Sequence, residues 1–194
     1  MKTLPKYLMI TGSDPKLKDK FIEKLISHIN NGIKLIQLRA KELNNEEYVS
    51  LAEIAIEIGR KFGAKIILNS NIETAKALNA DGVHLTSDIL MECYERPLHR
   101  NTLISAACHN SEQLKHAELI GVDFVTLSPV CRTKTHPDAI PLGWPHFSEL
   151  CKSINMPVYA LGGITESDLD VAISNGAYGI ASISSLWDNP QRFF

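Results

Sequence analysis

Three polar side chains alternate along one short segment and could bind an anionic ligand. Gln37, Arg39 and Lys41 lie two residues apart, so a strand and its direct extension would point them to one side. Burying such a row costs free energy unless a ligand or partner compensates for it. Arg39 could hold a phosphate through two parallel hydrogen bonds, and Lys41 could act as a mobile point charge. The alternative is structural, with Arg39 paired to a carboxylate inside the molecule.

Two apolar segments, Pro157–Leu161 and Gly179–Ile183, are each followed by a pair of small residues. These pairs are Gly162-Gly163 and Ser184-Ser185. Glycine lets backbone N–H groups approach an anion closely, and a following helix offers its positive end. Alanine at Gly163 should weaken binding by crowding the approach of the backbone, with little effect on the fold if φ there is negative. Two turns built from small residues without a ligand are the alternative. We predict a phosphate site at the ends of both segments, formed by Gly162, Gly163, Ile183 and Ser184.

Further polar residues stand at or near the ends of other predicted strands: Asn69, His84, His109 and Ser128. A histidine within a strand is usually a satisfied core group, which favours a structural role for His84, whereas His109 is expected at the rim. The segment 132–136 offers hydroxyls and positive charge for a phosphate, with a solvated loop as the alternative; its candidate residues are Thr133, Thr135 and His136. Asp88 is the candidate carboxylate for a divalent ion.

Eight apolar segments alternate with segments of helical period at intervals of about 20–25 residues. The predicted strands are Tyr7–Thr11, Lys34–Arg39, Lys65–Ser70, Gly82–Thr86, Leu103–His109, Phe124–Val130, Pro157–Leu161 and Gly179–Ile183. This pattern predicts one α/β domain over residues 1–194, a (β/α)8 TIM barrel with a truncated last helix. An open doubly wound sheet is the alternative.

Helix boundaries follow from polar caps and glycines. The longest helix is expected over Asn45–Phe62, and Ser111 and Thr165 are expected to cap two later helices. The last helix is nearly absent, and aromatic side chains are expected to fill the gap that it leaves: Trp187, Phe193 and Phe194.

Composition excludes several classes of partner. A net charge of −2 and a pI near 6.4 give no electrostatic basis for binding nucleic acid or an anionic membrane. No apolar run approaches the roughly 18 residues of a membrane span, and no secretory signal is evident. Four cysteines without CxxC spacing indicate free thiols. We therefore expect a cytoplasmic protein that binds a small molecule.

Almost the whole chain resembles the thiamine phosphate synthase and thiazole tautomerase family. The resemblance rests on IQLRAK (36–41), ADGVHL (80–85), ACH (107–109), DFVTLSPVCRTKT (123–135), PVYALGGI (157–164) and GAYGIAS (176–182). It implies a TIM barrel that joins a pyrimidine diphosphate to a thiazole phosphate and releases diphosphate with the help of Mg²⁺, through a pyrimidine cation.

The resemblance also implies roles for individual residues. The Gln-x-Arg-x-Lys row, at Gln37, Arg39 and Lys41, would contact the diphosphate. The paired threonines would be Thr133 and Thr135. The backbone amides that hold the product phosphate would belong to Gly162, Gly163, Ile183 and Ser184.

Some positions depart from the synthase pattern. Asn69-Ser70 stands where the synthase has Asn-Asp, and Asp88 lies one residue before the expected second magnesium carboxylate. Ala107 replaces a serine, and His136 replaces a lysine. The resemblance thus leaves one carboxylate ligand of Mg²⁺ missing.

Two alternatives to a synthase follow. ERPL (95–98), THPDAIPLGW (135–144) and PVYALGG (157–163) resemble the synthase-like domain that follows a Nudix hydrolase in some bacterial fusion proteins. The chain would then be a non-catalytic or redirected module that binds phosphorylated metabolites and partners a Nudix enzyme. A thiazole tautomerase-like isomerase is the other alternative, although Pro129 stands where the tautomerase has its catalytic histidine. A second copy of the chain, which would form a homodimer, is a further candidate partner.

Overall fold

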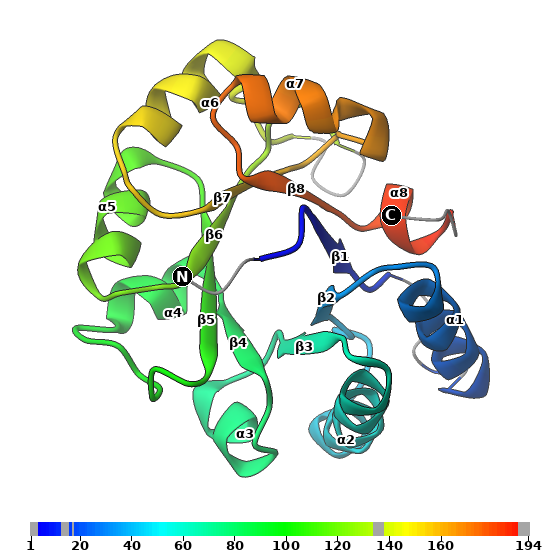
Figure 1. Ribbon diagram of the computed structural model, residues 1–194. Coiled ribbons are helices and arrows are strands. Elements are labelled where there is room, and N and C mark those ends of the chain that lie inside the picture. The colour runs from blue at the N-terminus through cyan, green and yellow to red at the C-terminus, as the bar shows by residue number, and fades with distance from the viewer. Residues whose placement is uncertain (1–3, 13–15, 17, 134–137, 190–194) are drawn as a thin grey trace.

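The computed structural model describes residues 4–12, 16, 18–133 and 138–189, which form a closed barrel of eight parallel strands (Figure 1). Each strand pairs with the next along the chain, and β1 closes the ring by pairing with β8. The strands are β1 Tyr7–Ile10, β2 Leu35–Leu38, β3 Lys65–Leu68, β4 Gly82–Leu85, β5 Leu103–Cys108, β6 Phe124–Leu127, β7 Val158–Leu161 and β8 Gly179–Ser182. The predicted TIM barrel is confirmed, and the open sheet is wrong.

A helix follows each strand and packs outside the ring (Figure 1). The helices are α1 Lys18–Asn30, α2 Asn45–Phe62, α3 Ile72–Ala77, α4 Ser87–Glu92, α5 Ser111–Leu119, α6 Gly143–Lys152, the 3-10 turn η1 Glu166–Asp168 with α7 Leu169–Ser174, and α8 Ser184–Trp187. Four residues form α8, as expected for a truncated last helix. Phe193 and Phe194 lie outside the described residues.

Trp187, the last residue of α8, fills the space that a longer last helix would occupy. Its side chain is fully buried, and its ring lies 4.8 Å from that of Phe21 in α1. The carbonyl oxygen of Trp187 lies 2.9 Å from His28 Nε2, within hydrogen-bonding distance. Burial lowers the pKa of His28, which favours the neutral ring. The end of the described chain is therefore attached to the first helix.

Helix boundaries are set by local hydrogen bonds. Asn44 and Glu47 form a capping box at the start of α2, and Gly63 ends it in the left-handed conformation, so its predicted bounds are confirmed. The prediction for α5 is wrong by one residue, because the side chain of Asn110 caps it rather than Ser111. Thr165 opens η1, its N–H donating to the Asp168 carboxylate over 2.8 Å.

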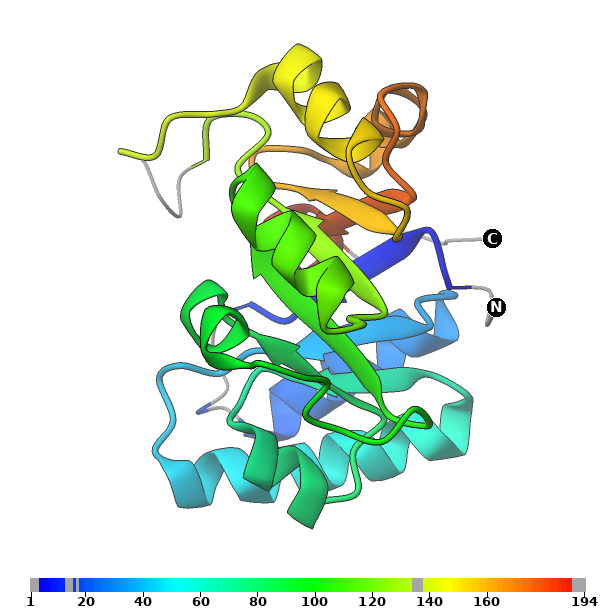
Figure 2. The ribbon, with the colours of Figure 1, turned by 90° about the vertical axis from the view of Figure 1, so that its left-hand side faces the viewer.

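The two ends of the barrel differ. At the N-terminal end, an apolar layer fills the ring with Leu8, Leu35, Ile67, Leu103, Phe124 and Tyr159. In the side view of Figure 2, the described part of the loop between β6 and α6 projects from the opposite end of the barrel. At that opposite end the strands finish and polar side chains enter the ring. Within the described ranges, no helix is long and apolar enough to cross a bilayer.

Candidate active site

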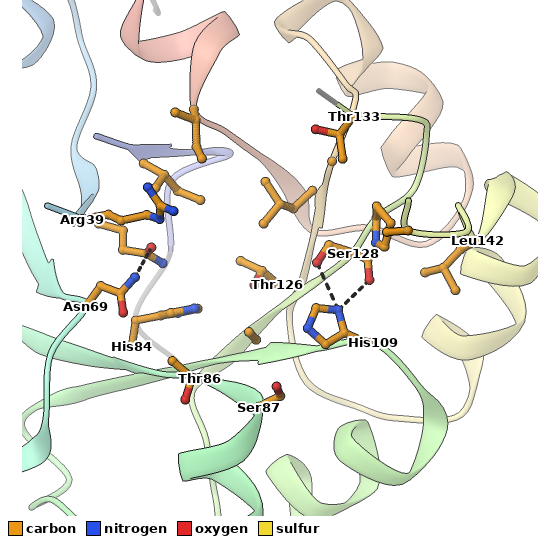
Figure 3. Close-up of a pocket in the computed structure, with 18 of the residues that line it drawn as sticks. Arg39, Asn69, His84, Thr86, Ser87, His109, Thr126, Ser128, Thr133 and Leu142 are labelled. Carbon is orange, nitrogen blue, oxygen red and sulfur yellow. Dashed lines mark hydrogen bonds between the residues drawn. The ribbon is translucent and has the colours of Figure 1, made fainter. Parts of the chain in front are cut away.

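A cavity of about 590 Å³ opens where the strands end (Figure 3). Side chains from six strands and the loops after them reach it, as expected for the functional end of a TIM barrel. It brings together most of the predicted site residues: Gln37, Arg39, Lys41, Asn69, His84, His109, Ser128, Thr133, Gly162 and Ile183.

A second cavity of about 600 Å³ adjoins the first at the ends of β7 and β8. All four residues of the predicted phosphate site line it: Gly162, Gly163, Ile183 and Ser184. Thr133, Leu161, Gly162 and Ile183 line both cavities, so the two share one wall. Two ligands could therefore lie next to each other across this wall.

The backbone of Arg39 is fixed by a side chain from β1. The hydroxyl of Thr11 accepts from Arg39 N–H over 2.8 Å and donates to the Arg39 carbonyl oxygen over 2.9 Å. The guanidinium is half-buried and makes no ion pair with a carboxylate in the part of the chain that the structure describes. Lys41 is exposed at the rim. The structural alternative for Arg39 thus finds no carboxylate partner there.

His84 is buried in the cavity wall as a neutral ring. Its Nδ1 lies 2.9 Å from the hydroxyl of Ser105 on the neighbouring strand. Burial lowers the pKa of His84 to about 4, because a charged imidazolium would be poorly solvated there. At neutral pH this side chain offers hydrogen bonds but no charge.

His109 extends from the end of β5 towards the end of β6 (Figure 3). Its Nδ1 lies 2.8 Å from the carbonyl oxygen of Ser128 and 3.4 Å from the hydroxyl of the same residue. A carbonyl oxygen can only accept, so Nδ1 carries the proton in the neutral ring. Nε2 is then left unprotonated, and it can accept a hydrogen bond or a proton.

The two glycines that follow β7 adopt backbone conformations that favour glycine. Gly162 has φ +98° and Gly163 has φ +68°. A Cβ on Gly163 would lie 2.2 Å from the carbonyl oxygen of Arg132, which is backbone. The condition set for an alanine there, a negative φ, is therefore not met. The fold itself therefore favours glycine at both positions.

Some candidates fall outside these cavities. Asp88 is exposed in the first turn of α4 and is absent from the walls of both. Thr135 and His136 lie outside the described residues. The four cysteines are free, and burial raises the pKa of Cys108 and Cys151 to about 12, so neither is a ready nucleophile.

Two wall residues, and one residue that contacts the wall from behind, were not anticipated. Thr126 lines the first cavity, and Ser105 contacts His84. In the second cavity, the hydroxyl of Ser185 donates to the carboxylate of Glu166. Thr126 lies two residues before Ser128 on one strand, and this alternation was the available signal.

Comparison with known proteins assigns the family. The family model described as thiamine monophosphate synthase matches residues 7–186. The chain is 38% identical over 181 residues to the "Putative thiamine-phosphate synthase 2" of Aquifex aeolicus, covering 93% of this chain and 97% of that protein. It is 32% identical over 167 residues to the thiamine-phosphate synthase of Syntrophomonas wolfei, covering 85% and 80%.

A solved structure supports the same fold. The thiamine phosphate pyrophosphorylase of Pyrococcus furiosus superposes with a TM-score of 0.76 at 24% identity, covering 96% of this chain and 92% of that one. At this identity the likeness concerns the barrel alone, and the assignment rests on the sequence matches. The chain belongs to the thiamine monophosphate synthase family.

Proposed function

We propose that the protein joins a pyrimidine diphosphate to a thiazole phosphate and releases diphosphate. The observation that carries this proposal is the shared wall between the two cavities, formed in part by Gly162 and Ile183. Because the two cavities adjoin at these residues, substrates bound in them would lie next to each other, which lowers the entropic part of the barrier. The names of the relatives support the same reaction.

The first cavity suits the pyrimidine diphosphate. Its walls are apolar at Ile10, Ala107 and Leu161, whereas Arg39 and Lys41 stand at its rim. In the proposed step, the bond between the pyrimidine methylene carbon and the diphosphate oxygen breaks, and the electron pair leaves with the oxygen. The guanidinium and the ammonium stabilise this developing charge.

The second cavity suits the thiazole phosphate. The N–H groups of the first turn of a helix have no acceptor within that helix, and Ser184 and Ser185 begin α8. Ser184, Ser185 and Gly163 line the cavity, and in this proposal their N–H groups would hold the phosphate. The thiazole nitrogen then donates its lone pair to the pyrimidine carbon, and the new C–N bond forms.

The residues present fit a protein-held Mg²⁺ poorly. No carboxylate appears among the residues that line the first cavity, and the described ranges contain no group of three metal-ligating side chains. Mg²⁺ usually binds through one or two carboxylates together with substrate phosphates. We keep Asp88 as the proposed carboxylate, and we assign charge neutralisation in the first cavity to Arg39 and Lys41.

A coupled assay tests the proposal. Purified protein is mixed with both substrates, and diphosphate release and the mass of the product are followed across a Mg²⁺ titration. We expect turnover with weaker Mg²⁺ dependence than a two-carboxylate site would give, and a steeper dependence in Ser70→Asp, with Ser70→Ala as the matched control.

Two outcomes would contradict the proposal or part of it. Binding of both substrates without diphosphate release would favour the non-catalytic module. In that case, we propose a Nudix enzyme as its partner. Fast turnover with tight Mg²⁺ dependence in the unaltered protein would overturn the assignment of charge neutralisation to Arg39 and Lys41.

A further inference from the structure

Two buried polar atoms in the wall of the first cavity have no hydrogen-bond partner among the described residues: Gln37 Nε2 and Thr126 Oγ1. Gln37 is 3% exposed and Thr126 is fully buried. Leaving a buried donor or acceptor unpaired costs free energy, so such groups are uncommon unless a ligand or water completes them. Both atoms belong to the same cavity, which links them to one ligand.

A second threonine shows that the fold can satisfy a buried hydroxyl. Thr11 is also fully buried, but its hydroxyl both accepts from and donates to the backbone of Arg39. The two threonines have the same side chain and the same burial, and they differ in whether the protein supplies a partner. The unpaired hydroxyl of Thr126 is therefore not a general property of the barrel interior.

The surroundings of Thr126 leave its hydroxyl available to the cavity. Ala107 is its register partner on β5, and this short side chain carries no polar group. Figure 3 places Thr126 in the middle of the cavity wall, between His84 and Ser128. On the other side of the barrel, Asn69 Nδ2 donates to Gln37 Oε1 over 3.5 Å. Gln37 Nε2 is left without an acceptor.

The chemistry of these atoms defines the ligand that would complete them. The Gln37 amide offers N–H donors and needs an acceptor, such as a ring nitrogen, whereas the Thr126 hydroxyl can donate or accept. Ile10, Ala107 and Leu161 provide apolar surface for the faces of a ring, and the cationic groups Arg39 and Lys41 stay at the rim. An uncharged, planar nitrogen heterocycle meets these requirements.

We propose that Thr126 is a substrate-contacting residue that sets specificity, its hydroxyl binding the polar edge of that ring opposite Gln37. The inference deepens the proposed function and rests on it, because the ring is the pyrimidine part of the proposed substrate.

The test measures binding and stability on the same variants. Isothermal titration calorimetry with a 4-aminopyrimidine that carries no phosphate should show about five- to tenfold weaker binding to Thr126→Val, since one hydrogen bond is lost. Thr126→Ser, which keeps the hydroxyl, should retain most of the affinity. Inorganic diphosphate, which would bind at the rim, should bind Thr126→Val and the unaltered protein equally.

Melting temperatures give the second readout. Thr126→Val should melt no lower than the unaltered protein, because an unpaired buried hydroxyl is replaced by a methyl group of similar size. Thr11→Val, the matched control, should melt lower because its hydroxyl has two partners. Two results would overturn the inference. One is that Thr126→Val binds the aminopyrimidine as tightly as the unaltered protein does. The other is that the unaltered protein does not bind the aminopyrimidine.

Failure of the proposed function would look different. In that case the unaltered protein would release no diphosphate, while its affinity for the ring would still depend on the Thr126 hydroxyl. Turnover of both substrates with no effect of Thr126→Val on ring binding or on KM would leave the proposed function intact and refute the role of Thr126.

Discussion

The two ends of the barrel differ in how some of their polar side chains are paired. At the N-terminal end, the hydroxyls of Tyr159 and Tyr178 donate to the carbonyls of Pro5 and Leu4, and the Lys6 ammonium donates to the Tyr178 carbonyl. At the C-terminal end, the amide nitrogen of Gln37 and the hydroxyl of Thr126 are left without described partners. These groups at the N-terminal end are therefore paired within the chain, whereas we propose that a ligand completes the two unpaired atoms at the C-terminal end.

A single strand contains both environments. Along β6, Phe124 packs in the apolar layer, Thr126 follows on the same side, and Ser128 comes just after the strand, beside His109. Only three residues thus lie between Phe124, which packs in the apolar layer, and Ser128, which lines the first cavity. Substitutions along this strand and its neighbours can separate the two roles.

The largest effect is expected at the N-terminal end. Phe124 is fully buried and packs edge-to-face against Tyr159, with ring centroids 5.3 Å apart. Phe124→Ala should lower the free energy of unfolding by about 3–5 kcal/mol, because the lost ring leaves a cavity. Urea denaturation measures this loss. The affinity of the folded fraction for inorganic diphosphate should be unchanged; a loss of affinity would break the separation between the two ends.

Acid should weaken the fold through His84. Its pKa is about 4 in the folded protein and about 6.5 in the unfolded chain, so the unfolded state binds the proton more readily. The contribution is full above pH 6.5 and is lost as the pH falls towards 4, by about 3 kcal/mol in total. The readout is the free energy of unfolding at several pH values.

His84→Gln is the control for this prediction. It removes the ring from the linkage, so its stability should fall less steeply between pH 6.5 and 4. His28, whose pKa is also lowered, contributes in the same direction in both proteins. The same pH slope in both proteins would show that His84 is already solvated in the folded state.

A smaller effect, confined to ligand binding, is expected at the rim. Arg39→Ala should weaken inorganic diphosphate about ten- to a hundredfold, because a half-buried, charge-assisted hydrogen bond is lost. Its melting temperature should change little, since Thr11 holds the backbone of this residue rather than its side chain. Arg39→Lys should lie between the two. Unchanged affinity with a lower melting temperature would instead make Arg39 a structural residue.

The sequence predicts the barrel well because its signals are local. Apolar segments at regular intervals specify the strands, and Asn44 with Gly63 specifies both ends of α2. Several strands end earlier than predicted. For example, β3 stops at Leu68 rather than Ser70, although the N–H of Asn69 still donates to the carbonyl oxygen of Leu38 on β2. The error at Ser111 arose because adjacent Asn and Ser are both good caps.

The candidate site is only partly predictable, because its chemistry depends on neighbours that are distant in sequence. Alternation along one strand was enough to place Gln37, Arg39 and Lys41 at one cavity. Whether a hydroxyl is paired cannot be seen from residue type, so Thr126 was missed. The exposure of Asp88 depends on the orientation of α4 relative to β4, which cannot be predicted from the pattern of residues.

The closure of the ring has a consequence for synthesis on the ribosome. Met9 pairs with Ile36 on one side and with Ser182 on the other, so the two neighbours of β1 are separated by most of the chain. At about 5–20 residues per second, β8 emerges roughly 10–35 s after β1. Throughout that time one edge of β1 is unpaired and open to other strands. The ring therefore cannot close until almost the whole of translation is complete.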